Sequence, residues 1–203
     1  IFSTNRLGLS DTFETGKSLT IGFEYLNEKK NSLDDVNNFF EFKIATVIRD
    51  KEESFISKQS TLNKKNSNIF GAIKKQISEN IQLNYNFSVD NNYSTFEYND
   101  LNATFSVNNV ITNFNFIEEN NEVGNTNVVK ASISYNPDDQ NSFSFNTRRN
   151  RKINLTEYYD LVYEYKNDCL IAGIKYNKTY YSDRDLKPSE NLLFTLSLVP
   201  LTT

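Results

Sequence analysis

The chain has 203 residues and a formal net charge of −4, with no histidine, no methionine and a single cysteine. Without histidine there is no Ser-His or Cys-His pair and no common zinc site, so most hydrolytic and zinc chemistry is excluded. The weak negative charge does not favour nucleic acid as a partner. We therefore predict no catalytic residue, no metal ligand and no cofactor, and we do not expect an enzyme.

The length suits one large β-domain, and no shift in composition marks a second domain. No run approaches the roughly 20 apolar residues that a membrane helix needs. The mean hydropathy of −0.60 would ordinarily argue against a membrane protein. It does not exclude one built of strands, because only alternate residues of a membrane strand face lipid. The aromatic content of 14%, with 16 Phe and 12 Tyr, is typical of such strands and of interfacial girdles.

The first strands follow a polar segment over 1–16, which we expect to be a loop. Leu19, Ile21 and Phe23 then alternate with polar or small residues, and a second alternating run covers 40–48. The segments 27–38 and 50–68 are charged and polar, and we predict both to be loops. A side-chain period of two residues is the signal of a strand with two different faces.

The clearest strand covers 81–89, where five apolar and four polar residues alternate without exception. It follows a strand over 69–77, and a strand over 96–107 comes next. Asn108 and Asn109 form a two-residue turn into a strand that begins at Val110, since asparagine tolerates the left-handed backbone of such turns.

The remaining runs start near Val129 and Phe143, and longer ones cover 157–166, 169–181 and 192–199. Short turns at 78–80, 108–109, 137–140 and 167–168 alternate with polar loops at 90–95, 118–127, 147–156 and 182–191. This asymmetry is typical of bacterial outer-membrane barrels, which have short periplasmic turns and longer external loops. The 27–38 connection is an exception, because it is too long for its periplasmic side.

The sequence thus predicts an all-β fold, an antiparallel up-and-down transmembrane β-barrel with about eleven strands and no helix. An odd number of strands does not close such a barrel, and the chain starts at Ile1 without an initiator methionine. We therefore expect residues 1–203 to be the C-terminal portion of a single outer-membrane barrel domain.

Both ends of the chain resemble the LptD family, the outer-membrane lipopolysaccharide-assembly proteins. Near the N-terminus the resemblance is to an Asn-Arg-x-x-Gly-x-Asp-x-x-Glu-x-Gly pattern, in which the first glycine comes one position early here, at Gly8. The terminal segments 157–176 and 181–200 resemble the same family. The N-terminal residues that match the pattern are Asn5, Arg6, Gly8, Asp11, Glu14 and Gly16.

This resemblance implies a translocon that inserts lipopolysaccharide into the outer leaflet of the outer membrane. It implies an N-terminal jellyroll and first barrel strands that lie upstream, a plug lipoprotein (LptE) and a periplasmic bridge protein (LptA) that contacts the jellyroll. The lipid would leave through a lateral gate between the first and last barrel strands. The last strand would consist of Leu192, Leu193, Phe194, Thr195, Leu196, Ser197, Leu198, Val199 and Pro200, where proline ends the pairing.

Two further features have both a functional and a plain interpretation. The resemblance places Cys169 in a periplasmic turn and implies a disulfide to a cysteine outside this chain, whereas a small buried residue at a strand start is the plain alternative. A basic cluster over 147–156 is a candidate for contacts with lipopolysaccharide phosphates, and a solvated external loop is the plain alternative. The cluster consists of Arg148, Arg149, Arg151 and Lys152.

Three rival functions share part of this evidence. A porin or an autotransporter translocator has the same alternation of residues and differs only at the two ends. A soluble carbohydrate-binding β-sandwich would need shorter strands and a core between two sheets. An outer-membrane hydrolase is disfavoured because the chain has no histidine.

Overall fold

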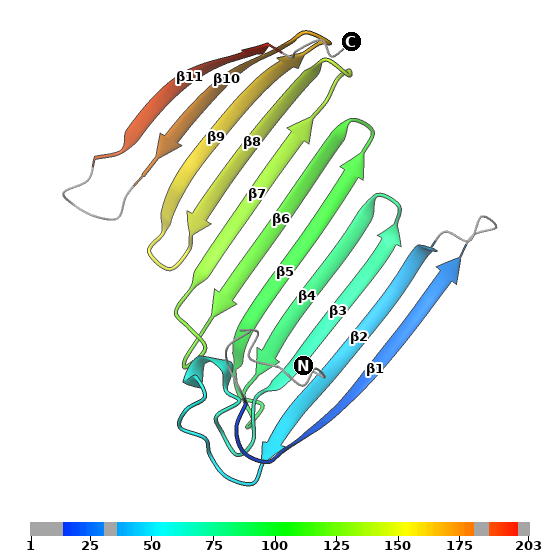
Figure 1. The fold of residues 1–203 in the computed structure, drawn as a ribbon, viewed down its shortest axis with the longest axis vertical. Helices are drawn as coiled ribbons and strands as arrows, with labels where there is room; N and C mark the ends of the chain where they lie inside the picture. Colours follow the sequence, from blue (N-terminus) through cyan, green and yellow to red (C-terminus); the bar gives the residue numbers. More distant parts are fainter. Residues whose placement is uncertain (1–13, 31–35, 181–186, 199–203) are drawn as a thin grey trace. The chain divides into compact units, whose positions relative to one another are not determined.

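The structure is a computed structural model that describes residues 14–30, 36–180 and 187–198. Within these residues the chain forms eleven strands and one short 3-10 helix, η1 (Lys58–Ser60). The strands form one sheet in which each lies beside the next in sequence, a simple meander (Figure 1). Their bounds are β1 (Ser18–Lys30), β2 (Val36–Arg49), β3 (Ile69–Ser78), β4 (Ile81–Val89), β5 (Phe96–Val107), β6 (Val110–Glu119), β7 (Asn127–Tyr135), β8 (Asn141–Asn150), β9 (Leu155–Lys166), β10 (Leu170–Thr179) and β11 (Ser189–Leu198).

The predicted all-β, up-and-down order of eleven antiparallel strands is confirmed. The strands β4 and β5 have the bounds that the alternation predicted. Strand length is 9 residues in β4 and β7 and 14 residues in β2, the longest. None of the helical structure in the described part of the chain is long and apolar enough to cross a bilayer.

The predicted 27–38 loop is wrong. β1 continues to Lys30 and β2 begins at Val36, with Asn27 opposite Phe40 and Lys29 opposite Asn38. Polar residues did not end these strands because strand pairing uses backbone groups, which every non-proline residue supplies. Only residues 31–35 separate the two strands, so this connection is no longer an exception to the short turns on its side of the sheet.

The predicted 147–156 loop is also too long. β8 continues to Asn150 and β9 starts at Leu155, which leaves only 151–154 as the connection. That connection is no longer than the turn at 136–140 on the other side. The predicted contrast between short turns and long loops is therefore strong between the 50–68 loop and the two-residue turn at 79–80. It is weak on the two sides of β8, where the connections are similar in length.

The chain divides into two compact units, unit 1 (Ile1–Leu101 and Ile117–Thr126) and unit 2 (Asn102–Phe116 and Asn127–Thr203). Each unit contains one mostly apolar and one mostly polar face, because residues opposite each other in neighbouring strands point the same way. In unit 1 the register aligns Phe23 with Ile44, and Ile73 with Tyr85. In unit 2 it aligns Leu161 with Phe145 and with Tyr176.

The apolar face is uncovered in both units. Leu19 and Phe23 on β1 are 60% and 57% exposed, and Leu161 on β9, which has a paired strand on each side, is 51% exposed. A soluble sheet buries such a face against another layer. All strands in the described part of the chain belong to one sheet, so the two-sheet sandwich alternative is wrong for this part.

The only cluster of buried apolar side chains in the described residues lies in unit 1. Val47 of β2 is fully buried against Ile56 and Leu62 of the 50–68 connection, and Phe70 of β3 packs against them. The sequence predicted 50–68 as a polar loop. It is a loop, but it folds onto the face of β2 that contains Ala45 and Val47, so two of its three large apolar residues, Ile56 and Leu62, are buried, while Phe55 is exposed.

Candidate functional site: the polar face of the sheet

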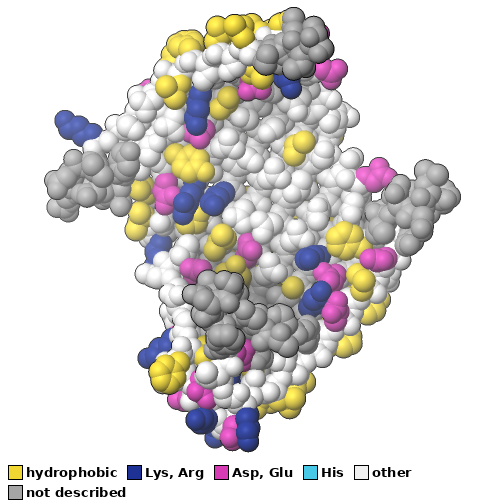
Figure 2. Space-filling model, in the orientation of Figure 1, with side chains coloured by type: hydrophobic (Ala, Val, Ile, Leu, Met, Phe, Trp, Pro, Cys, Tyr) yellow, Lys and Arg dark blue, Asp and Glu magenta, His cyan; other side chains and the backbone are white. Residues whose placement is uncertain are grey.

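The polar face of unit 1 contains a chain of opposite charges across β1, β2 and β3. The Lys43 ammonium lies 3.1 Å from a carboxylate oxygen of Glu24 and 2.5 Å from one of Glu41. Lys74 lies 3.4 Å from the other Glu41 oxygen. The strand register explains the two cross-strand contacts, since Lys43 is opposite Glu24 and Glu41 is opposite Lys74. Figure 2 shows acidic and basic side chains together over β1–β3.

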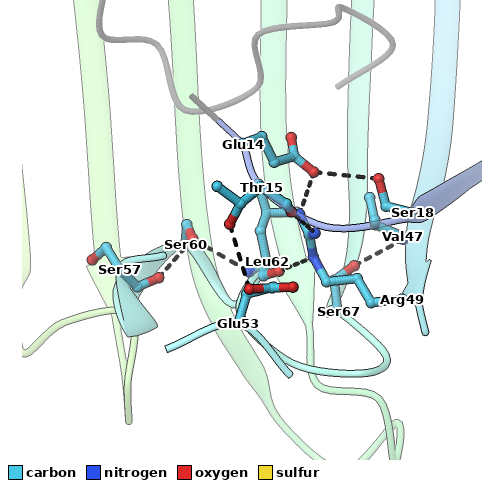
Figure 3. A network of polar contacts seen from close by, with 10 residues as sticks. All are labelled: Glu14, Thr15, Ser18, Val47, Arg49, Glu53, Ser57, Ser60, Leu62 and Ser67. Carbon is cyan, nitrogen blue, oxygen red and sulfur yellow. Dashed lines mark hydrogen bonds and ion pairs between the residues drawn. The ribbon is translucent and has the colours of Figure 1, made fainter. Parts of the chain in front are cut away.

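At the end of the same face, Arg49 anchors the 50–68 loop (Figure 3). Arg49 is only 3% exposed. Its Nε donates to the Leu62 carbonyl at 2.5 Å, its Nη1 donates to the Thr15 carbonyl at 2.9 Å, and its Nη2 pairs with the Glu14 carboxylate. One guanidinium thus ties together the segment before β1, the end of β2 and the loop, using the several donors that only arginine offers in fixed directions.

Backbone pairing holds the return of the loop beside β2. The Ser67 amide donates to the Val47 carbonyl at 2.9 Å, and the Val47 amide donates to the Ser67 hydroxyl at 2.9 Å. The Arg49 amide donates to the Lys65 carbonyl at 2.7 Å. The 50–68 loop is therefore held against the polar face by these contacts and does not extend away into solvent.

Of the six residues that match the LptD-like N-terminal pattern, the structure describes Glu14 and Gly16, while Asn5, Arg6, Gly8 and Asp11 lie outside the described residues. Glu14 accepts from Arg49, as above. Gly16 has a φ of +83°, and a Cβ there would lie 2.3 Å from Glu53 Oε1. Both residues thus help to seat the loop, while any role in lipopolysaccharide assembly remains a prediction.

A hollow of about 590 Å³ lies among the loops of unit 1, between 52–68, 90–97 and Glu122. Three lysines and four acidic residues line it, and the Lys64 ammonium lies 2.8 Å from the Glu122 carboxylate. This contact lowers the pKa of Glu122 below its ordinary value. The described residues contain no group of acidic or cysteine side chains that could hold a metal ion.

The polar face of unit 2 has a different character, because uncharged amides and hydroxyls dominate it. Thr104 of β5 donates to Asn113 of β6 at 3.0 Å, and Asn115 donates to Asn102 at 2.7 Å. Asn113 in turn donates to Ser132 of β7 at 3.4 Å. These contacts link Thr104, Asn113 and Ser132 across three strands, with the Asn102–Asn115 pair as a second link between β5 and β6.

The predicted basic cluster does not form a single site. Arg148 lies opposite Lys130 while Arg149 lies opposite Val129, so strand alternation places the two arginines on different faces. Each also has its own partner, because Arg148 lies 2.8 Å from Glu157 and Arg149 donates to Asn154.

The other two cations of this group lie in the 151–154 turn. The Arg151 guanidinium lies over the Phe116 ring at 5.7 Å, and the Lys152 amide donates to Asn150. Contacts of any of the four with lipopolysaccharide phosphates remain a prediction.

Cys169 lies in a turn of unit 2, and the last strand begins at Ser189, three residues before the predicted Leu192. Cys169 is an exposed free cysteine in the turn before β10, not a buried residue, and a disulfide to another part of a longer protein remains a prediction. β11 is last in the strand order and pairs with β10 from Ser189 to Leu198. Val199 and Pro200 lie outside the described residues, so the predicted end of pairing at proline is not visible.

Sequence reasoning missed Arg49 and the amide surface of unit 2. Arg49 ends an alternating run and resembles any charged residue at a strand end, so only the fold of the loop reveals its burial. The amide surface could have been found by aligning the polar positions of neighbouring strands. That alignment requires the register, which the turn at 108–109 suggests for β5 and β6 alone.

Comparisons with known proteins give a structural likeness only. No protein-family model matches the sequence, and no curated protein matches it. Among solved structures, two engineered mutants of the porin from Rh. blastica are similar to this chain with a TM-score of 0.44 and 11% sequence identity. Each similarity covers 92% of this chain and 82% of the porin chain.

Proposed function

We propose that this chain forms part of the wall of a β-barrel in the bacterial outer membrane, with its apolar face toward lipid and its polar face lining a water-filled pore. One observation supports this most directly: the apolar face of both units is uncovered, while the opposite face is polar. Exposed apolar surface of this extent is costly in water and favourable in hydrocarbon. All eleven strands have at least the 9 residues found in β4, about the length that a tilted strand needs to cross a bilayer.

The proposal is a non-enzymatic passage for hydrophilic solutes through the polar face. A single sheet with unpaired edges would be unstable in a membrane, so the barrel must be completed by strands other than those described. These further strands would pair with β1 and with β11, because these two strands end the strand order of the described residues.

The test is reconstitution of the purified full-length protein into planar lipid bilayers. We expect discrete conductance steps in salt solution. We also expect the apolar-face residues to be protected from water-soluble thiol reagents when they are changed one at a time to cysteine in a Cys169→Ser background, which removes the exposed native thiol. Positions such as Phe23 and Leu161 should be protected, and Lys43 and Asn146 should react. Reaction of all four positions in the bilayer would contradict the proposal.

A narrower candidate is insertion of lipopolysaccharide through a lateral gate, with LptE and LptA as partners. Besides the resemblance of the chain ends, the place of β11 at the end of the strand order supports it, since a seam between terminal strands opens without breaking other pairs. Depletion of the protein distinguishes the two functions. Loss of lipopolysaccharide from the cell surface supports the gate, whereas unchanged surface lipopolysaccharide with reduced solute uptake supports the pore.

A further inference from the structure

A hollow of about 270 Å³ opens on the polar face of unit 2, across β5 to β9. Figure 2 leaves the surface over β6 and β7 largely uncoloured, the colour of backbone and uncharged polar side chains. The polar side chains at its centre are Asn102, Thr104, Asn113, Asn115, Ser132 and Asn146.

Four of these side chains form a row across β5 to β8. Thr104, Asn113 and Ser132 are linked by hydrogen bonds, and Ser132 lies opposite Asn146. Asn146 lies opposite Asp160 on β9. Neighbouring strands are about 4.8 Å apart, so the row offers one hydrogen-bonding side chain at each such step.

The charge at this hollow is low. Lys130 is the one charged residue among its lining residues, and no carboxylate lines it. The nearby Arg148 is occupied by Glu157 at 2.8 Å. A phosphate site would need converging cations, and a divalent cation site would need several oxygen ligands with negative charge. Neither is present among the described lining residues.

We infer that this hollow binds neutral saccharides. A linear saccharide would lie along the row of polar side chains, with about one sugar ring over each strand. Amide side chains both donate and accept, as sugar hydroxyls do, so neighbouring asparagines match adjacent hydroxyl pairs. The strand spacing is close to the length of a sugar ring. Tyr158, half-buried in the lining, offers an aromatic surface for the apolar side of a ring. The inference rests on the proposed function in one respect: the polar face must be open to water, so that a dissolved saccharide can reach it.

The main experiment measures current through the full-length protein in planar bilayers while a linear neutral glucose hexasaccharide is added. We expect concentration-dependent block of the current, with inorganic phosphate at the same concentration giving no block. Conductance without block by the hexasaccharide would overturn the saccharide site and leave the proposed pore intact. Block by phosphate as strong as by the sugar would also overturn it.

A second measurement is independent of the pore. Saturation-transfer NMR on the detergent-solubilised protein should show transfer to the hexasaccharide and none to a polyether of similar size. If no conductance appears but the sugar binds, the pore proposal fails and the saccharide site stands. If the sugar does not bind in micelles, the site is overturned whatever the bilayer result.

Variants locate the site. The double substitution N113A/N146A should weaken hexasaccharide binding about tenfold or more, since each change removes a hydrogen-bonding group. The control is S144A on the same strand and face as Asn146 but outside the lining, and it should bind as the parent does. Far-UV circular dichroism of each variant shows whether the sheet is intact. Equal binding by the folded double variant and the parent would overturn the assignment to this hollow.

The saccharide could be free in solution or the headgroup of a neutral glycolipid. The two sources are separated by adding the hexasaccharide to the aqueous side in one arm and placing a neutral glycolipid in the bilayer in the other. Protection of N146C from thiol reagents by either ligand supports the site. Protection by neither contradicts it.

Discussion

The two units share the same alternation but use their polar faces differently. Unit 1 covers the end of its face with the 50–68 loop, buries Arg49 beneath it and pairs Lys43 with Glu24 and Glu41. Unit 2 leaves its face open around Asn113, where Lys130 is the one charged lining residue. The apolar faces of both units are uncovered and alike. The apolar face therefore determines the fold, and the polar face is where the units can differ in function.

The largest expected effect is on the anchor of unit 1. Arg49→Ala removes one member of a buried ion pair with Glu14 and also removes the donor to the Leu62 and Thr15 carbonyls. We expect a loss of about 3–5 kcal/mol in the free energy of unfolding, as for other buried pairs broken on one side. Urea unfolding in phospholipid vesicles, followed by far-UV circular dichroism, measures it.

The matched control for this change is Lys43→Ala on the same strand, whose side chain is 36% exposed. Its cost should stay below about 1 kcal/mol, since partly exposed pairs contribute little. Limited proteolysis should also cut Arg49→Ala within 51–60 faster than the control. If both variants unfold at the same urea concentration, Arg49 does not anchor the loop.

The second effect compares a glycine in each unit. A Cβ on Gly71 of β3 would lie 2.0 Å from the Phe87 ring, and that ring is held by Tyr85 at 5.4 Å and Phe96 at 6.0 Å between centroids. Gly71→Ala should therefore cost about 1–3 kcal/mol, the usual range for overpacking. The same unfolding assay measures it, and Phe87→Leu in the same chain should recover part of the loss.

Gly173 of β10 is the counterpart in unit 2. A Cβ there would meet the Thr195 hydroxyl at 2.7 Å, and that exposed side chain can rotate away. Gly173→Ala should be nearly neutral, because alanine also restricts the unfolded chain. A loss at Gly173 equal to that at Gly71 would show that ring packing is not the cause.

The third effect concerns ion selectivity of the proposed pore. Glu41→Gln leaves Lys43 and Lys74 without their shared carboxylate, so the reversal potential in a salt gradient should shift toward anions. In unit 2, Asn115→Asp adds a negative charge to a surface whose one charged lining residue is Lys130, and it should shift the reversal potential toward cations. Stability should change by less than about 1 kcal/mol in Glu41→Gln. Shifts in the same direction would mean that the two faces do not line one pore.

The sequence was sufficient to predict the number and order of the strands, but not the length of every connection between them. Alternation set β4 and β5 to the residue, because a period of two fixes both the strand and its faces. It failed at 27–38, where charged residues looked like a loop although backbone pairing continues from Lys29 to Asn38. Charged and polar composition shows which side chains prefer water. The end of a strand depends instead on where its partner strand stops offering backbone groups to pair with.

The candidate sites were predicted less well for a related reason. The basic run at 148–152 looked like one patch, but strand alternation separates Arg148 from Arg149. The amide row brings Thr104, Ser132 and Asn146 together from three strands, and sequence distance gives no sign of it. Sites that form across strands require the register of every pair between them.

The smallest expected effect is on acid stability, and it compares a loop of unit 1 with a turn of unit 2. In the 90–95 loop the Thr95 amide donates to Asp90 at 2.8 Å and the Ser94 hydroxyl donates at 2.8 Å, which lowers the pKa of Asp90. In the 136–140 turn, the Asn141 side chain and the Gln140 amide lower the pKa of Asp138 in the same way.

Because both pKa values are lower in the folded than in the unfolded chain, each carboxylate stabilises the fold fully above its ordinary pKa of about 3.9, and this contribution is lost as the pH falls through the lowered value. Asp90→Asn and Asp138→Asn should each reduce the acid dependence of the urea midpoint measured below about pH 5, with the larger part of that dependence remaining. An unchanged slope in both test variants would mean that these hydrogen bonds also form in the unfolded chain.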